Sequence, residues 1–436
     1  MKKKYYMETY GCQMNKAESE AVSIVLIESG WEPVEDPAEA HIILLNTCSV
    51  RKTAEERVWG RLGALKGYKK RDVRIVLMGC MAERLKDKIF AKEPSVDLVV
   101  CNFDKKELPL LLERIQDQKP HVISNSHDHY DFLSIHENSG FKAFIPIMHG
   151  CNNFCTYCIV PHVRGREISR APVSILNEIA LLEKRGIKEI TLLGQNVNSY
   201  CYDVNGVNLD FTGLLKLIIS NIGGIHWVRF LTSHPKDFPK ELIDIIATSQ
   251  HLCKHIHLPV QHGSNRILEQ MERKYSREDY LAIIEALKAK VPGVSITTDI
   301  LIGFPGETQD DFDQTLDLMK TVEFDDAFMY RYNRIEGTKA YDMENQLEEK
   351  VKLQRLNEII QIQRKIAGKK KKNKVGRVMK ALIEGMSKHS DKELLARSEF
   401  DDMVIIPGDS ADIGKMVTLK IGGLKGNTLL GEKICD

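Results

Sequence analysis

The sequence lacks a long apolar run, a recognisable secretion leader and a strong net charge. No stretch of its 436 residues approaches the roughly 18 to 20 apolar residues that span a membrane. Residues 1–6 lead into no signal-peptide core, so we expect a cytoplasmic protein. The formal charge of +1 gives no whole-chain argument for nucleic-acid binding. The length suits two or three domains.

The cysteines also lack the pattern of structural zinc, because no second C-x-x-C pair lies near Cys155 and Cys158. Ten cysteines without a secretion signal favour reduced thiols over a disulfide framework. Cys151, Cys155 and Cys158 have the spacing C-x-x-x-C-x-x-C, one thiolate short of the four that fill a [4Fe–4S] cluster. We expect a cluster with one open iron; the weaker alternatives are a zinc site or a run of buried cysteines.

Residues 1–118 alternate short apolar runs with amphipathic stretches, which predicts an α/β domain with a doubly wound parallel sheet. Strands are expected at 5–10, 41–47, 74–78 and 96–100, and helices near 16–29, 53–66, 82–90 and 105–116.

Three further cysteines, Cys12, Cys48 and Cys80, each come directly after one of these strands. The carboxyl ends of the strands in an open α/β sheet line one crevice, so we expect the three thiols to converge there. One cysteine at a strand end is an ordinary small buried residue. Three at successive strand ends predict a second metal centre.

Residues 119–140 are polar and without periodicity, which indicates a linker. They carry His121, His127, His129 and His136. Their irregular spacing fits no ligand geometry, so metal binding is not favoured.

The strand–helix rhythm resumes in residues 141–368 and predicts a partial (βα)6 barrel with its site at the carboxyl ends of the strands. The expected strands are 141–148, 189–193, 227–232, 255–260, 295–302 and 327–332.

The last part, residues 369–436, is predicted to be a small antiparallel β-barrel after a long helix at 346–366. It opens with Lys369, Lys370, Lys371 and Lys372. Beside a small β-barrel this run favours contact with RNA phosphates. A solvated helix end is the alternative for such a run taken alone.

Seven short motifs carry a resemblance to a known family. They are TYGCQMN (9–15), NTCSVR (46–51), GCMAER (79–84), GCNNFCTYCIVP (150–161), GQNVNSY (194–200), HLPVQ (257–261) and GFPGET (303–308). With them the sequence resembles the radical S-adenosylmethionine (SAM) methylthiotransferases along nearly its whole length. The C-terminal part resembles their RNA-binding TRAM domain.

This resemblance implies two [4Fe–4S] clusters and two SAM molecules per product. The cluster at Cys151, Cys155 and Cys158 would give an electron to SAM, and the 5′-deoxyadenosyl radical would abstract the C2 hydrogen of an adenine. The other cluster would hold a sulfur that a different SAM methylates. The resemblance further implies two partners, a tRNA anticodon stem-loop and a low-potential electron donor. It also implies that the enzyme is a monomer.

The residues after Cys12 and around Cys48 look like the branch that modifies adenosine 37 of tRNAs already bearing an N6-isopentenyl group. The alternative is the same chemistry on threonylcarbamoyladenosine 37 or on a ribosomal-protein aspartate. A non-catalytic electron-transfer or RNA-binding protein is a third, weaker hypothesis.

The resemblance also suggests residues that contact the cofactor and the RNA. SAM contacts are expected from Gln195, Asn196, Ser233, Arg273, Gly303 and Gly306. Arg273 would pair with the SAM carboxylate, and the glycines would admit the adenine or simply form a turn. RNA contacts are expected from Arg164, Arg166 and Arg331, with ordinary surface arginines as the alternative.

Three residues depart from the family pattern, namely His162, His262 and Cys101. Neither histidine replaces a cluster ligand. Cys101 follows the fourth expected strand, where it would either close the open iron of the second cluster or be an ordinary buried cysteine. We expect the latter.

Overall fold

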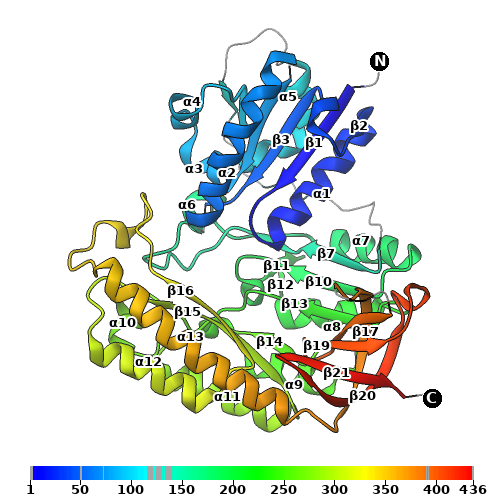
Figure 1. Ribbon diagram of the computed structural model, residues 1–436, viewed down its shortest axis with the longest axis vertical. Helices are drawn as coiled ribbons and strands as arrows, with labels where there is room; N and C mark the ends of the chain where they lie inside the picture. Colours follow the sequence, from blue (N-terminus) through cyan, green and yellow to red (C-terminus); the bar gives the residue numbers. More distant parts are fainter. Residues whose placement is uncertain are drawn as a thin grey trace.

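The computed structural model describes residues 3–49, 52–71, 73–114, 121–123, 130, 132, 140–388, 390 and 392–434. Figure 1 shows three parts: an N-terminal α/β domain above, a larger α/β barrel below it, and a small β-barrel beside the larger one. No helix in these ranges combines the length and apolarity needed to cross a membrane.

The N-terminal domain is built on a six-stranded parallel sheet in the order β2-β1-β3-β4-β5-β6. The strands are β1 (Lys3–Thr9), β2 (Trp31–Pro33), β3 (Ile42–Thr47), β4 (Arg74–Gly79), β5 (Leu98–Val100) and β6 (His121–Ile123). The sequence predicts four of them. It misses β2 and β6, which are three residues each and too short to show a period.

Helices cover both faces of this sheet, as a doubly wound fold requires. They are α1 (Gln13–Glu28), α2 (Lys52–Leu65), α3 (Cys80–Leu85), α4 (Lys88–Lys92) and α5 (Leu108–Arg114). Ile42 and Leu44 pack with α1 and α5, whereas Ile43 and Leu45 pack with α2, α3 and α4. The alternation follows because successive side chains of a strand point to opposite faces.

Strand β6 lies inside the expected linker, so His121 belongs to the sheet and pairs with Leu98 of β5. His127, His129 and His136 lie outside the described residues.

The central part is the predicted partial barrel of six parallel strands. Its strands are β7 (Lys142–Pro146), β10 (Glu189–Leu193), β13 (Trp227–Phe230), β14 (His255–His257), β15 (Ser295–Ile302) and β16 (Asp326–Arg331). They run as β7-β10-β13 and β14-β15-β16, and a parallel bridge between Val228 and Leu252 joins the two sets. One apolar core is formed by buried residues of the barrel strands and of the helices that pack on them.

Helices follow the strands on the outside of the barrel. They are α6 (Val160–Arg164), α7 (Pro172–Lys184), α8 (Phe211–Asn221), α9 (Lys240–Thr248), α10 (Asn265–Gln270), α11 (Arg277–Lys290) and α12 (Gln309–Val322). Two short pairings were not expected from the sequence: β8 (Met148–His149) with β9 (Ile168–Ser169), and the hairpin β11 (Cys201–Val204) with β12 (Val207–Asp210).

The long helix α13 (Glu349–Lys372) crosses the outer side of the barrel and leads into the small β-barrel (Figure 1). The helix expected from the sequence ends at residue 366, whereas the observed helix continues through the four lysines. Lysine is a good helix former, and its charge is favourable at a helix C-terminus.

The C-terminal part is a closed five-stranded barrel in the order β17-β18-β19-β21-β20. Its strands are β17 (Val378–Met386), β18 (Glu393–Ser398), β19 (Met403–Pro407), β20 (Met416–Lys425) and β21 (Thr428–Lys433). The expected antiparallel pairing holds for all neighbours except β19 and β21, which are parallel. Strands of strictly alternating direction cannot close a ring of five.

The small barrel docks at the amino ends of the large-barrel strands through charged and apolar contacts. Arg229 of β13 donates to the Ser398 carbonyl at 2.7 Å and to Glu189 at 2.9 Å. Arg397 of β18 pairs with the same Glu189. Trp227 packs with Leu382 beside them. The small barrel therefore lies at the opposite end of the strands from the cysteine loop.

Candidate cluster and cofactor site

The loop that carries Cys151, Cys155 and Cys158 is held tightly at the carboxyl end of the barrel. The amide of Cys151 donates to Gly165 at 3.1 Å, and the amide of Cys158 donates to Cys155 at 2.9 Å. Gly150 has φ of +80°, and a Cβ there would lie 2.0 Å from the carbonyl oxygen of Arg166. Only glycine fits this approach, so the start of the loop is fixed by the backbone.

The three thiols of this loop are free and close enough to interact electrostatically. Burial, with a smaller contribution from Cys155, raises the pKa of Cys158 to about 12. Burial also raises the pKa of Cys151 to about 11. Thiols in such surroundings become thiolates when a metal replaces the proton, so the donor set fits a metal centre.

Cys12, Cys48 and Cys80 lie on three loops that meet at the carboxyl ends of β1, β3 and β4. Cys12 precedes α1, and Cys80 opens α3. A Cβ on Gly11 would lie 2.8 Å from the Cβ of Cys48. Asn15 ties two of the loops together by donating to the carbonyls of Tyr10 at 2.9 Å and Thr47 at 3.0 Å.

Cys80 interacts electrostatically with Cys12, and burial raises its pKa. In the part of the chain that the structure describes, no three His, Cys, Asp or Glu side chains are placed to hold a single metal ion. In a four-iron cluster each cysteine binds a different iron, so its thiolates stand farther apart. Cys101 is buried after β5, and its amide pairs with the carbonyl of Ile123 in β6.

Four buried polar atoms at the carboxyl ends of β10 and β13 have no hydrogen-bond partner. They are Gln195 Oε1, Asn196 Oδ1, Ser233 Oγ and His234 Nε2. The two loops are bonded together, because the amide of Val197 donates to Thr232 at 3.1 Å. Buried polar atoms normally have partners. Their grouping fits a polar ligand such as the amine and ribose of SAM.

His234 was not singled out by the sequence analysis, although it directly follows Ser233 at the end of β13. Burial, and next the charge of Arg273, lower the pKa of His234 to about 2. The imidazole is therefore neutral at physiological pH. It offers a ligand a hydrogen bond without a charge.

Arg273 is 5% exposed and lies against the first cysteine loop. It donates to the Cys155 sulfur at 3.4 Å, to the Pro259 carbonyl at 2.9 Å and to the Tyr275 hydroxyl at 3.0 Å. All three of its nitrogens are thus engaged. This geometry places Arg273 beside a cluster thiol, and its expected pairing with the SAM carboxylate stays a prediction.

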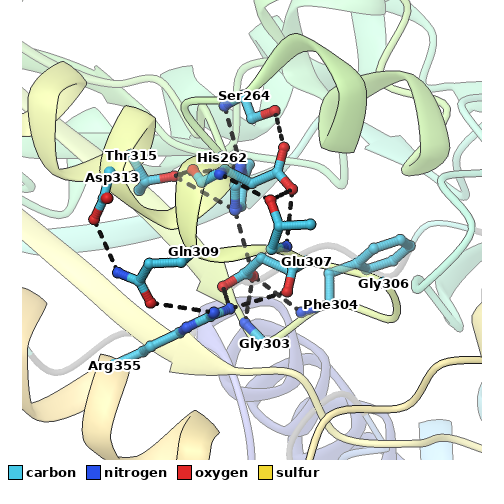
Figure 2. A network of polar contacts seen from close by, with 12 residues as sticks. His262, Ser264, Gly303, Phe304, Gly306, Glu307, Gln309, Asp313, Thr315 and Arg355 are labelled. Carbon is cyan, nitrogen blue, oxygen red and sulfur yellow. Dashed lines mark hydrogen bonds and ion pairs between the residues drawn. The ribbon is translucent and has the colours of Figure 1, made fainter.

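The turn at residues 303–306 is held by one buried carboxylate, that of Glu307 (Figure 2). Glu307 accepts the amides of Gly303 at 2.5 Å and Phe304 at 3.1 Å. Arg355 of α13 donates to the same carboxylate at 2.6 Å, and His262 lies 3.3 Å from it. His262, which departs from the family pattern, is fully buried in this network.

Both glycines of this turn have left-handed backbones, with φ of +69° at Gly303 and +76° at Gly306. A Cβ on Gly303 would lie 2.6 Å from the Lys352 side chain, whereas one on Gly306 would meet only Gln270 Oε1 at 4.0 Å, an ordinary contact. At Gly303 a side chain would both collide with Lys352 and strain the left-handed backbone, whereas at Gly306 it would only strain the backbone.

The residues expected to contact RNA fall into two groups. Arg166 and Lys372 are exposed. The others have partners within the chain: Lys369 with Glu323 at 2.7 Å, Lys370 with Asp325 at 2.5 Å, Lys371 with the Asn427 carbonyl at 2.6 Å, and Arg331 with Glu349. Much of the lysine run therefore serves to dock α13 and the small barrel.

Arg164 corrects an expectation, because it is 2% exposed and pairs with Glu18 of α1 at 2.6 Å. Its guanidinium is buried between the barrel and the N-terminal domain, so it is not exposed to a binding partner. The sequence does not reveal this, since the partner lies 146 positions away.

Three family models match successive parts of the chain. Residues 4–101 match the uncharacterized protein family UPF0004, residues 145–319 the radical SAM superfamily, and residues 372–434 the TRAM domain.

Solved structures show the same fold at low sequence identity. The radical SAM methyltransferase TsrM from Kitasatospora setae has a TM-score of 0.59 and 15% identity, covering 78% of this chain and 74% of its own. The cobalamin-dependent SAM radical enzyme OxsB has a TM-score of 0.52 and 13% identity, covering 83% of this chain and 56% of its own.

Curated relatives match nearly the whole chain and share one name, tRNA-2-methylthio-N(6)-dimethylallyladenosine synthase. The protein from Treponema denticola is 46% identical and covers 97% of this chain and 98% of its own. The one from Treponema pallidum subsp. pallidum is 45% identical, with 98% and 97% covered. The one from Clostridium tetani is 43% identical, with 99% and 96% covered.

The barrel, its cysteine loop and the matching family model define a radical SAM enzyme. With relatives above 40% identity over nearly its full length, the chain belongs to the tRNA-2-methylthio-N(6)-dimethylallyladenosine synthases.

Proposed function

We propose that this enzyme converts N6-isopentenyladenosine at position 37 of tRNA into its 2-methylthio derivative, using SAM and two [4Fe–4S] clusters. When bound, the clusters supply the electron that cleaves SAM and the sulfur that is inserted. The C2–H bond of adenine is unactivated, so cofactors have to carry the hard chemistry while the protein positions them.

One observation carries this proposal: two sets of three cysteines, each one thiolate short of a full cluster, lie on adjoining domains. Cys80 packs directly against Ile159 and Val163, which follow the cysteine loop of the barrel. A site that only cleaves SAM needs one such set. Two sets on facing loops suit a reaction in which one centre generates a radical and the other supplies sulfur.

The chain's own residues would bind and orient SAM. Gln195, Asn196, Ser233 and His234 would bind the polar atoms of SAM, since each has a buried polar atom without a hydrogen-bond partner among the described residues. Asn196 is already oriented, because its amide donates to Asp237 at 2.8 Å. The turn at residues 303–306 would receive the adenine of SAM. Glu307 would hold the backbone of this turn in place by accepting the amides of Gly303 and Phe304.

Arg273 would act beside the cluster rather than on SAM. A guanidinium within hydrogen-bond distance of the Cys155 sulfur would donate to a ligand of the bound cluster. Burial, and next the charge of Arg273, keep His234 neutral, so the pocket gains no second cation that would repel the SAM sulfonium.

RNA phosphates are proposed to contact two exposed cations, Arg166 just after the cysteine loop and Lys372 at the end of α13. The substrate is the anticodon stem-loop, whose target base must leave the stack to reach a buried site. We further propose a monomer in the cytoplasm that takes electrons from a low-potential donor, since tRNA and reduced thiols are found there.

The experiment that tests this function incubates the anaerobically reconstituted enzyme with SAM, dithionite and a synthetic anticodon stem-loop with or without the isopentenyl group. Nucleoside mass spectrometry should find the methylthio product only on the isopentenylated loop, together with 5′-deoxyadenosine. Product only on the loop without the isopentenyl group would overturn the substrate. Absence of 5′-deoxyadenosine under reduction would overturn the radical chemistry.

A further inference from the structure

Arg164 joins the two halves of the site. It is the last residue of α6, just after the cysteine loop of the barrel, yet its guanidinium reaches α1 of the N-terminal domain. Its Nη1 lies 2.6 Å from Glu18 Oε1, and its Nη2 lies 3.3 Å from Glu18 Oε2 and 3.0 Å from Asn15 Oδ1. These contacts fix a cation at the domain boundary.

The same guanidinium lies beside the cysteines of the N-terminal domain. The Cys12 sulfur is 3.7 Å from Asn15 Oδ1, the oxygen that also accepts from Arg164. Cys80 packs on Val163, the neighbour of Arg164 in α6. Arg164 interacts electrostatically with the thiols of both Cys12 and Cys80. A residue of the barrel therefore contributes charge to the centre of the other domain.

Two buried cations share the carboxylate of Glu18. Lys105 Nζ lies 2.5 Å from Glu18 Oε2, so two buried cations, Arg164 and Lys105, meet one buried carboxylate. A buried cation that shares its carboxylate with a second cation is less fully compensated, which is costly. A negatively charged centre at the cysteines would compensate for it.

We propose that Arg164 is the fixed counter-charge of the Cys12, Cys48 and Cys80 centre, and that it stabilises the more reduced, more negative state of that centre. The inference rests on the proposed function, since it assumes a cluster there. Reduction adds one electron to the cluster, and a cation held nearby lowers the energy of that extra charge. Arg164 is thus a positioning residue that acts through the field of its guanidinium.

The test measures the reduction potential of this cluster alone. The variant Cys151→Ala/Cys155→Ala/Cys158→Ala removes the other cluster, and dithionite titration is followed by electron paramagnetic resonance. In that background, Arg164→Met should lower the potential by about the equivalent of a tenfold change in the ratio of reduced to oxidised cluster, which is about 59 mV for one electron. Glu18→Gln should raise the potential, because it removes the opposing charge.

The matched controls separate charge from structure. Arg166→Met removes an exposed cation two positions away and should leave the potential unchanged, because solvent screens it. Arg164→Lys keeps the charge and should stay closer to the parent than Arg164→Met. If Arg164→Met does not fold, the potentials of Arg164→Lys and Glu18→Gln, compared with those of the parent and Arg166→Met, still test the inference.

Shifts of the same direction in Arg164→Met and Glu18→Gln would mean that lost packing, not charge, moves the potential, and would overturn the inference. Unchanged potentials in variants that hold about four irons would overturn it while leaving the proposed function intact. A background protein that holds no iron at all with Arg164 present would overturn both.

Discussion

Arg355 donates a hydrogen bond of 2.6 Å to the buried carboxylate of Glu307, which itself accepts the amides of Gly303 and Phe304. A side chain of α13 thus supports the turn that is proposed to receive SAM, as Figure 2 shows. Because α13 leads directly into the small β-barrel, the same contact connects that barrel with the proposed SAM-binding turn.

The first prediction concerns this pair. Arg355→Met leaves Glu307 buried without its guanidinium, which should destabilise the protein by about 3 kcal/mol and weaken SAM binding about tenfold. Equilibrium dialysis of labelled SAM with the reconstituted enzyme measures the second effect. Arg364→Met, an exposed arginine on the same helix, is the control and should change neither quantity. Normal SAM affinity in Arg355→Met would show that the turn does not depend on α13.

The second prediction is a pH dependence at the contact between the two barrels. His255 of β14 lies 4.0 Å from Asp401, and its ring pairs with Thr297 at 2.9 Å. Burial, with Arg229 adding to it and Asp401 opposing it, lowers the pKa of His255 to about 4. In the unfolded chain the pKa is about 6.5, so between these values the unfolded state binds more protons than the folded state.

Stability from His255 is therefore present above about pH 6.5 and is lost as the pH falls toward 4, by at most about 3 kcal/mol. Urea unfolding followed by tryptophan fluorescence reports it, because Trp227 lies in this contact. His255→Asn should lose less stability between pH 7 and pH 5 than the parent protein. An equal loss in both would assign the pH dependence to other groups.

The sequence predicts the strand-end cysteines well because their placement follows from topology. Parallel strands bring their carboxyl ends to one edge, so Cys12, Cys48 and Cys80 converge without any knowledge of side-chain packing. Long-range ion pairs have no such rule. Arg164 follows the cysteine loop in sequence, but its burial depends on Glu18, which the packing of α1 against the barrel brings to it.

The lysine run also shows that the sequence does not reveal long-range partners. Composition identifies four adjacent cations, yet only the docking of α13 decides which of them have partners. Lys370 faces Asp325 before β16, and Lys371 faces the Asn427 carbonyl in the small barrel, whereas Lys372 is exposed. Neither of these partners is adjacent in the sequence.

The third prediction separates these lysines by function. Lys372→Gln should weaken binding of the anticodon stem-loop and reduce the slope of log affinity against log salt by about one. Lys370→Gln should leave the salt slope unchanged and cost about 1 kcal/mol of stability through its lost pair with Asp325. Fluorescence anisotropy at several salt concentrations tests both. Equal slopes for Lys372→Gln and the parent would remove Lys372 from the RNA surface.

The fourth prediction concerns metal content. Anaerobic reconstitution should give about eight irons per chain, and Cys12→Ala/Cys48→Ala/Cys80→Ala should give about four. Cys101→Ala is the control, and it should keep about eight irons, because Cys101 follows a different strand and is expected to be an ordinary buried cysteine. A fall in iron content in Cys101→Ala would show instead that this cysteine is a ligand.

The fifth prediction uses Gly150, where the backbone leaves no room for a side chain. A Cβ there would lie 2.0 Å from the Arg166 carbonyl oxygen, and φ is +80°. Gly150→Ala should push the loop of Cys151 out of place, lower the iron content to about four per chain and abolish 5′-deoxyadenosine formation.

Gly186 provides a matched control for backbone strain, with φ of +84° and no atom within 4 Å of the added Cβ. Gly186→Ala carries a similar left-handed penalty of about 1 to 2 kcal/mol, but it meets no neighbour. It should therefore lose stability and keep its iron. If both variants lost iron alike, general destabilisation would explain the loss; if only Gly150→Ala does, the close contact with Arg166 is what holds the radical-generating loop in place.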